Sequence, residues 1–467
     1  MKSRLWIFVA LSVPCVFFTM VGISLCAEYH VALNGSDSGG NGSLSYPWRS
    51  PVYGASRLSS GDTLYIHAGT YQVTTTNSPI KNAAICPAAD NTTIKSYPGD
   101  TVILVGNGGI APTNGVIGTH DGRNIRNNVT IDGLIIQGVV VVMGNGHIVQ
   151  NCDISIGGDS WSGIGQGEVI WIENAANCII RNNKIHNNTV QSGHRLNSPL
   201  IMEYGSSGIT IENNEIYNSV GNGVMLKDHP QNMTVRYNYI HDTYYSGIWT
   251  ANQVSADNVE IYQNVFNNCN NGTLDPNYAE HGGVSIVIHA TNVKIYNNTF
   301  FNSGNADIVH WVSDTSATFH VWNNISANPK LNHISFPYSA SVLQGSLLYC
   351  DYNNYYNDVQ WRYRSNVYST LANWRTACQS MVAACDSHSI TDNPNFLNSS
   401  GTWSRPEDFK RSSYPANGRG GNYAAVMGAY ITGNEIIGCG SGVNPAPPSP
   451  PPPVSAPSAP SGLRIIQ

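Results

Sequence analysis

The chain has 467 residues, of which only 11% are charged, and its formal net charge at pH 7 is −6. Soluble domains usually carry about 25% charged residues, so neutral polar side chains must dominate this surface. The sequence has no basic clusters, which argues against nucleic acid or an anionic membrane surface as a partner. It also has no long apolar stripe with a helical period, which excludes a mostly α-helical protein.

The first predicted segment is an export signal at residues 1–27. Lys2 and Arg4 precede an apolar run from Leu5 to about Leu25, and small residues before Glu28 offer a cleavage site. The run is also long enough for an uncleaved membrane anchor, which is the alternative interpretation. Cleavage would give a secreted protein, extracellular or periplasmic, without a membrane segment.

Cysteines in such a compartment can pair. Cys378 and Cys385 share a local stretch of sequence and are the best candidates for a bridge. Cys152 takes an inward position in the repeat described next, and we expect it to be a buried thiol.

A phrase of the form apolar-x-x-Asn-x-apolar returns along the chain, as in Ile180-Arg-Asn-Asn183-Lys-Ile185. Successive key asparagines are separated by 31, 24, 26, 34, 26 and 29 residues: Asn183, Asn214, Asn238, Asn264, Asn298, Asn324 and Asn353. A repeat of this length with variable insertions is typical of a solenoid, in which each turn packs only against its neighbours. We therefore predict one solenoid domain over residues 28–440. Residues 441–467 begin with a Pro-, Ser- and Ala-rich stretch and are predicted to be a linker or tail.

Alternation within a turn predicts which side chains face inward. Apolar residues and asparagine alternate in the phrase, so stacked asparagine amides are expected to hydrogen-bond to one another inside the solenoid. A second polar column, expected to support the turns, follows four residues later: Asn187, Asn218, Asp242, Asn268, Asn302 and Asn328. Two residues before each key asparagine the side chains point outward. Tyr262 and Tyr296 in that column are candidate sugar-stacking residues, with a covered face as the alternative.

Another strand lies about eleven residues before each key asparagine, and its outward positions carry the candidate site. An alignment of these strands places Glu173, Glu203 and Lys227 on three successive turns. Neighbouring strands are about 4.8 Å apart, so two carboxylates and an amine are expected in one row.

Each strand also has an outward position two residues before its place in this charged row. These positions include Trp171 and Trp249, and Trp311 if the next turn keeps register. Indole rings beside charged groups are typical of carbohydrate-binding surfaces, which favours an open glycan groove. In the alternative, insertions such as residues 191–199 and 270–282 fold over this face and bury the rings.

Both ends of the predicted domain resemble a known family. The opening Tyr29-His-Val-Ala-Leu-Asn-Gly-Ser-Asp37 and the segment Gly61–Tyr71 look like the amino-terminal cap of secreted right-handed parallel β-helix proteins. This pectin-lyase-like group includes alginate lyases, chondroitinase B and some pectate lyases. Closing segments such as Asp392–Phe396 and Met427–Tyr430 are similar to the end of many such proteins. The resemblance implies an all-β fold, a single-stranded right-handed parallel β-helix, with residues 51–59 as an amino-terminal cap helix and a monomeric protein.

The alginate lyase and chondroitinase B group also implies a mechanism. Elimination within a polysaccharide that contains uronic acid needs a base near C5 and a cation that holds charge on the carboxylate. The resemblance places the base at Lys227. It implies Ca²⁺ held by acidic residues, for which the candidates are Glu173, Glu203 and Asp228. The turn expected to carry an arginine, residues 247–251, has no cation. The candidates to replace it are Arg236, His229, His241 and His289.

The sequence therefore favours a lyase that acts on an acidic polysaccharide, with two alternatives left open. Glu173 and Glu203 on neighbouring turns would suit a retaining glycoside hydrolase, whose carboxyl groups lie about 5–5.5 Å apart. The third possibility is a glycan-binding or cell-surface solenoid without catalysis. Lys227 would then be a solvated or salt-bridged lysine beside Glu203.

Overall fold

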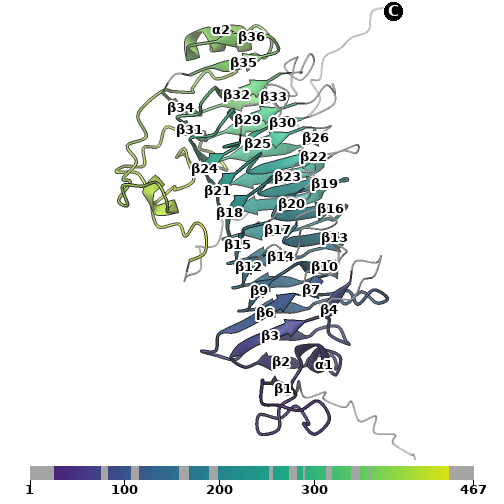
Figure 1. Cartoon of the computed structure of the whole chain (residues 1–467). Coiled ribbons are helices and arrows are strands. Elements are labelled where there is room, and N and C mark those ends of the chain that lie inside the picture. The colour runs from purple at the N-terminus through teal and green to yellow at the C-terminus, as the bar shows by residue number, and fades with distance from the viewer. Residues whose placement is uncertain are drawn as a thin grey trace, which may run out of the picture.

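The computed structural model describes residues 26–74, 82–106, 115–156, 168–188, 198–251, 256–272, 281–287, 290–311, 318–337, 348–357 and 359–440. Three long parallel sheets stack along one axis, and each turn of the solenoid adds one strand to each sheet (Figure 1). The predicted all-β parallel β-helix is therefore confirmed. Most of the export signal predicted at residues 1–27, and the whole predicted tail at 441–467, lie outside the described residues.

The strands fall into three sets. The first sheet contains β1 (Glu28–Val31), β2 (Thr63–Ile66), β5 (Thr93–Ser96), β8 (Thr130–Asp132), β11 (Ile148–Gln150), β14 (Ile179–Arg181), β17 (Thr210–Glu212), β20 (Gln231–Arg236), β23 (Ala256–Tyr262), β26 (Ala290–Thr291), β27 (Val293–Tyr296), β30 (Phe319–Trp322) and β33 (Leu348–Asp351). The second sheet contains β4 (Ala83–Ile85), β7 (Gly115–Gly118), β10 (Val140–Asn145), β13 (Ile170–Ala176), β16 (Ile201–Tyr204), β19 (Val224–Lys227), β22 (Ile248–Ala251), β25 (Gly282–Ile286), β29 (Ala306–His310), β32 (Asn332–Phe336), β35 (Trp361–Tyr363) and β36 (Asn366–Tyr368). The third sheet contains β3 (Gly69–Val73), β6 (Val102–Gly106), β9 (Ile135–Gln137), β12 (Asp153–Ser155), β15 (Lys184–His186), β18 (Glu215–Ser219), β21 (Tyr239–Thr243), β24 (Val265–Cys269), β28 (Thr299–Phe301), β31 (Ile325–Ala327) and β34 (Asn354–Tyr356).

The predicted asparagine ladder is present inside the solenoid. Asn238 is completely buried, and its amide donates to Asn264 Oδ1 (2.9 Å) and to the carbonyl of Ile211 (2.8 Å). Its own Oδ1 accepts from the backbone N–H and the amide of Asn214, both at 3.0 Å. The same pattern links Asn183 to Asn353, so every turn of this stretch is tied to the next through buried hydrogen bonds.

The second polar column supports turns, as predicted. Its members adopt left-handed backbone angles, which asparagine and aspartate tolerate better than other side chains. Asn218 also donates from its amide to Asn187 Oδ1 (3.1 Å) on the previous turn. These residues therefore stabilise the turns of the solenoid, and they are not candidates for catalysis.

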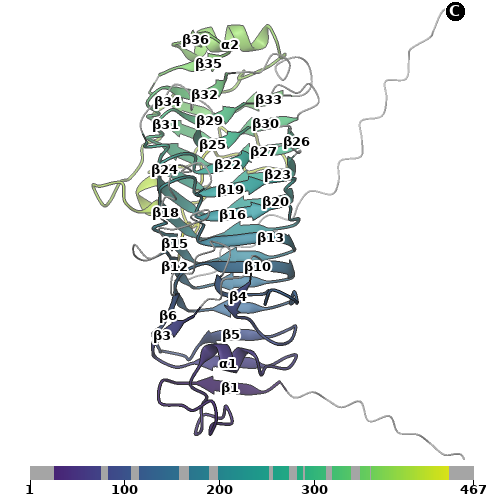
Figure 2. The same ribbon diagram turned by 45° about the vertical axis from the view of Figure 1, so that its right-hand side comes forward.

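A short helix, α1 (Pro51–Ala55), packs against the first turns at the amino-terminal end (Figure 2). Ser50 caps it by accepting from the N–H of Tyr53 (3.3 Å). Gly54 lets the helix approach the core, because a Cβ there would lie 2.9 Å from Val31 Cγ2. The predicted helix at residues 51–59 exists but ends at Ala55, since the following residues form turns.

The carboxy-terminal end of the solenoid is closed by the hairpin β35–β36 and by α2 (Leu371–Gln379). Trp374 of α2 is completely buried and stacks on Phe336 at 6.0 Å between ring centres. The predicted bridge between Cys378 and Cys385 is present, and Cys152 is a buried thiol as expected.

After this end the chain turns back as the C-terminal arm (residues 391–440), which includes a short 3₁₀ helix (Pro406–Phe409). The arm runs back along the side of the solenoid toward β18 (Figure 1). Phe409, Met427 and Tyr430 of the arm form a second core with outward residues of the third sheet such as Phe301. None of the helices in the described ranges is long and apolar enough to cross a membrane.

Candidate functional site

The register of the second sheet corrects the predicted charged row. Glu173 pairs with Tyr204, and Tyr204 pairs with Lys227. Glu203 lies one position earlier, beside the buried aliphatic residues Ile172 and Leu226. The alignment of Glu203 with Glu173 and Lys227 is therefore wrong by one residue, and such a slip moves a side chain to the opposite face of the sheet.

Glu203 is a core residue. It is completely buried, and its Oε1 accepts a hydrogen bond from the backbone N–H of Ser206 (2.6 Å). Burial raises the pKa of this carboxyl to about 8, so the neutral form predominates at pH 7. Glu203 is consequently unsuited to hold Ca²⁺ beside Glu173 or to serve as one of two exposed carboxylates.

Tyr204 takes the place that the sequence analysis gave to Glu203. The Nζ atom of Lys227 lies 5.6 Å from the centre of the Tyr204 ring. A hydrogen bond to Asp228 raises the pKa of the Tyr204 phenol above its ordinary value. The phenol therefore stays protonated at neutral pH and can donate a proton. A Tyr204 side chain in this row was not predicted, although alignment of Leu200-Ile201 with Val169-Ile170 would have found it.

Glu173 is held by its neighbour on the same strand. Trp171 donates from its indole nitrogen to Glu173 Oε2 (2.9 Å), and its ring stacks on Tyr204 at 6.3 Å between ring centres. Trp171 is only 4% exposed and Trp249 only 7%. The prediction of an open groove lined by these two indoles is therefore wrong. Both rings are buried, as the alternative expected, and most of the insertions that it named lie outside the described residues.

The turn after β19 completes the cluster. Asp228 and His229 both adopt left-handed angles, with φ of 53° and 72°. Both residues lie in the turn that ends β19, and positive φ values are common at turns of this solenoid. His229 Nε2 lies 3.6 Å from Asp257 Oδ2 on β23, one turn further along. We call these half-buried residues the Lys227 cluster: Glu173, Tyr204, Lys227, Asp228, His229 and Asp257.

Other candidates lie away from this cluster. Arg236 belongs to the first sheet, where Glu212 (2.7 Å) and the Tyr262 hydroxyl (2.9 Å) engage its guanidinium. Tyr262 and Tyr296 stack on each other at 4.8 Å on the same sheet. His241 belongs to the third sheet, where it contacts Glu215 and Asp242.

Two further candidates from the sequence analysis are Trp311 and His289. Trp311 follows β29 and is partly exposed. It does not continue the column of Trp171 and Trp249, because Trp249 pairs with Ser285 and Ser285 pairs with Val309, two positions before Trp311. His289 lies outside the described residues.

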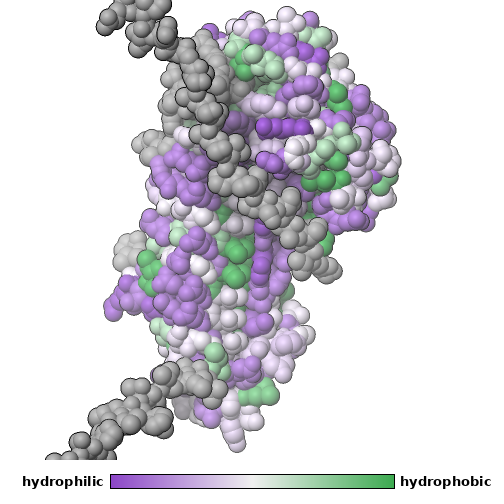
Figure 3. Space-filling model, turned by 180° about the vertical axis from the view of Figure 1, so that it is seen from behind, coloured by the Kyte–Doolittle hydropathy of each residue, from purple (hydrophilic) through white to green (hydrophobic). Residues whose placement is uncertain are grey.

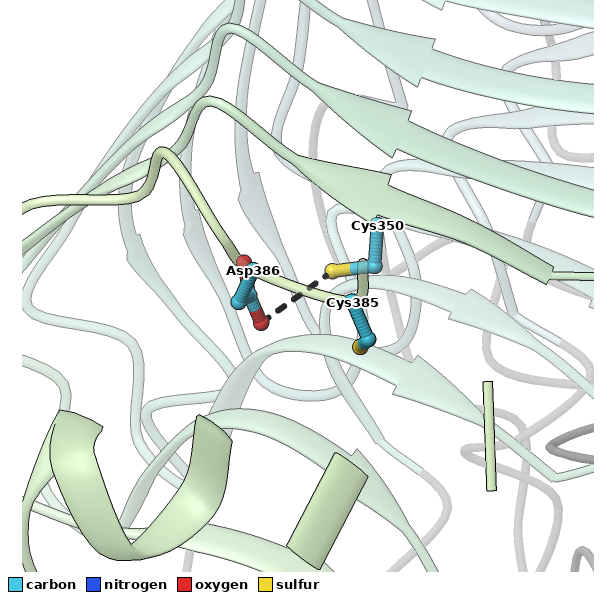
Figure 4. A group of neighbouring side chains, drawn as sticks. All are labelled: Cys350, Cys385 and Asp386. Atoms are coloured by element: carbon cyan, nitrogen blue, oxygen red, sulfur yellow. Dashed lines mark hydrogen bonds between the residues drawn. The ribbon is translucent and has the colours of Figure 1, made fainter. Parts of the chain in front are cut away.

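The predicted calcium ligands do not converge. Within the described ranges, one group of three Asp, Glu, His or Cys residues brings its ligand atoms together, and it is Cys350, Cys385 and Asp386 (Figure 4). Cys385 is bonded to Cys378, and the Asp386 carboxylate accepts from Trp374 Nε1 (2.7 Å) and the Tyr355 hydroxyl (3.0 Å). This group is therefore a buried structural network. Glu173, Glu203 and Asp228 do not fit a shared calcium site, and we derive no step through the ion.

Comparisons with known proteins agree with the architecture. Residues 114–300 match the family model described as "Right handed beta helix region". The pectate lyase Pel9A is similar in structure, with a TM-score of 0.51 and 13% identity over 88% of this chain and 97% of that protein. XylC in complex with xylose gives a TM-score of 0.47 and 14% identity over 72% and 84% of the two chains. The alginate lyase AlyF-OU02 gives 0.42 and 14% over 74% and 86%. No curated protein matches the sequence.

The fold and the family model define this chain as a right-handed parallel β-helix protein. The resemblance to pectin-lyase-like β-helix proteins drawn from its sequence is confirmed at the level of the fold.

Proposed function

We propose that the protein is a secreted lyase that cleaves a polysaccharide containing uronic acid by β-elimination at the Lys227 cluster. The observation that carries this proposal is the row Glu173–Tyr204–Lys227 on three adjacent strands of the second sheet. An amine and a protonated phenol lie side by side there, and they can serve as the base and the acid of an elimination.

Lys227 and Tyr204 each transfer one proton in this reaction. The Lys227 amine, after it has released its own proton to solvent, removes the proton at C5 of the uronate, and the electron pair forms the C4–C5 double bond as the C4–O bond breaks. Tyr204 donates its phenolic proton to the leaving oxygen. The lysine ends protonated and the tyrosine as a phenolate, so the two groups must exchange a proton through solvent before the next turnover.

His229 is the cationic candidate that the structure brings to this cluster. It follows Lys227 by two residues and lies on the same edge of the second sheet, whereas Arg236 is engaged on another sheet. An imidazolium at His229, whose Nε2 lies 3.6 Å from Asp257 Oδ2, would hold charge on the substrate carboxylate. An acidic substrate, secretion and a monomeric state are part of the proposal. Glu203 is turned into the core, so the proposed elimination does not use Ca²⁺ held jointly by Glu173, Glu203 and Asp228.

The burial of Glu203 bears on the first alternative. A retaining hydrolase needs two carboxyl groups facing one substrate, and Glu203 is turned into the core. The pair Glu173 and Glu203 therefore gives no support to hydrolysis. A glycan-binding protein without catalysis remains the competing hypothesis that the experiment must address.

The test is to incubate the purified protein with polygalacturonate, alginate and chondroitin, with Ca²⁺ and with a chelator. Elimination produces an unsaturated uronate, which is followed by its ultraviolet absorbance, and reducing ends are counted in parallel. Unsaturated product supports the lyase. Reducing ends without unsaturation would indicate a hydrolase, and tight binding without either product would indicate a glycan-binding solenoid.

A further inference from the structure

A hollow of about 340 Å³ opens beside α1 at the amino-terminal end of the second sheet. Its lining includes apolar side chains of small size: Val52, Ala83, Ala84, Pro87 and Ala88. Ligand sites in proteins usually measure about 300–1,000 Å³, so this hollow has room for one sugar-sized ring and not for a chain.

Asp121 and Arg126 supply the charged groups of the lining. The Asp121 carboxylate accepts from the N–H groups of Arg123 (2.8 Å) and Asn124 (2.7 Å), from the Asn124 side-chain amide (3.1 Å) and from Arg126 Nη2 (3.1 Å). Arg126 Nε donates to the carbonyl of Pro87 (2.8 Å). Both side chains are therefore fixed before any ligand arrives, which lowers the entropic cost of binding.

The charge of this pair selects the kind of ligand. Arg126 and Asp121 neutralise each other, so an anion entering the hollow would compete with Asp121 for the guanidinium. Within the described part of the chain, Arg126 Nη1 makes no hydrogen bond to the protein. The pair thus presents one donor, Arg126 Nη1, beside a carboxylate whose two oxygens already accept from four N–H donors, an arrangement that suits the oxygen of a neutral hydroxyl group.

The hollow and the Lys227 cluster share one edge of one sheet. Residues 86–88 follow β4 and residues 121–126 follow β7, just as Asp228 and His229 follow β19. Four strand spacings separate β7 from β19, which corresponds to about 19 Å at the usual spacing of about 4.8 Å. An extended oligosaccharide can span this distance along the sheet edge.

From this arrangement we infer that the hollow between α1 and the Asp121–Arg126 pair is a binding site for one neutral sugar residue, distant from the Lys227 cluster. The sugar's C–H face packs on the small aliphatic wall, and one of its hydroxyl oxygens accepts from Arg126 Nη1, which Asp121 holds in place through Nη2. The choice of a sugar as ligand rests on the proposed function, whereas its neutral character rests on the charge pair alone.

The test measures binding of D-glucose, D-galactose, D-mannose, D-xylose and D-galacturonate to the whole protein by saturation-transfer NMR and calorimetric titration. At least one neutral sugar should bind saturably. Ala88→Phe, at an exposed position of the lining, should abolish that binding, because the ring fills the hollow. Arg126→Gln should weaken it at least tenfold, while Arg123→Gln, whose exposed side chain lies outside the lining, should leave it unchanged.

Three results would overturn the inference: equal binding by the parent and Ala88→Phe, stronger binding of D-galacturonate than of every neutral sugar, or no binding of any sugar. The lyase proposal is tested separately with Lys227→Ala. Sugar binding that survives in this variant, without cleavage of any polymer by the parent, would support the hollow and reject the lyase. Cleavage by the parent without sugar binding would support the lyase and reject the sugar site in the hollow.

Discussion

The Nζ atom of Lys227 lies 5.6 Å from the centre of the Tyr204 ring, and the two residues occupy paired positions on β19 and β16. This contact replaces the Lys227–Glu203 neighbourhood expected from the sequence. The difference matters chemically, because a carboxylate beside the lysine would form a salt bridge, whereas a protonated phenol adds a second group that can transfer a proton.

Lys227→Ala is expected to remove eliminative cleavage while the melting temperature changes little. Loss of a general base typically costs about 10²–10⁴-fold in rate, and a half-buried lysine stem supports little packing. Initial rates on the preferred polymer and a thermal melt check both parts. Lys184→Ala, which removes an exposed lysine of the third sheet, is the matched control and should keep full activity. Full activity in Lys227→Ala would reject the assignment of the base.

Tyr204→Phe separates the acid from the base. The variant keeps the ring beneath Lys227 but loses the hydroxyl that bonds to Asp228, so turnover should fall about 10²–10⁴-fold. The free energy of unfolding should fall by no more than about 1 kcal/mol, the usual worth of one hydrogen bond. Tyr217→Phe on the third sheet, whose ring stacks between His186 and His241, is the control. Parent-like turnover in Tyr204→Phe would exclude the phenol as the proton donor.

Asn238→Leu should destabilise the solenoid by about 3 kcal/mol or more. The substitution removes the acceptor of two Asn214 groups and the donor to the Ile211 carbonyl, and each buried group left without a partner costs about 1–3 kcal/mol. Denaturant unfolding of parent and variant gives the difference. Asn232→Leu, at an exposed position of β20, is the control and should cost less. Equal stability of Asn238→Leu and the parent would contradict the ladder's energetic role.

The repeat predicted the fold well because its signal is local and recurs on every turn. Each key asparagine is flanked by apolar residues at fixed offsets, so the inward phase of the first and third sheets follows directly from the sequence. The second sheet lacks such an anchor. Insertions of variable length precede its strands, and the one-residue error at Glu203 arose there.

The sequence left open whether the tryptophans are exposed or buried. Outward positions on a solenoid strand are exposed unless another segment covers them, and the sequence does not state which segments fold back. The C-terminal arm shows this plainly, because it covers outward residues such as Val265 and Phe301 of the third sheet. Figure 3 shows the rear of the molecule, where purple hydrophilic residues and green apolar patches lie side by side.

Glu203→Gln distinguishes the core position of this residue from the calcium ligand that the sequence suggested. The folded carboxyl has a pKa of about 8, against an ordinary value of 4.5, so between these values the folded state keeps a proton that the unfolded state releases. The stability contributed by Glu203 is fully present below about pH 4.5 and is lost as the pH rises toward 8.

Glutamine does not ionise, and its oxygen can still accept from the Ser206 N–H. The stability of the parent relative to the variant should therefore fall between pH 5 and pH 8, which denaturant unfolding across this range measures. The buried Asp307 has a raised pKa in both proteins and cancels in the comparison. A pH-independent difference, or a variant whose main defect is weaker calcium binding, would place Glu203 on the surface after all.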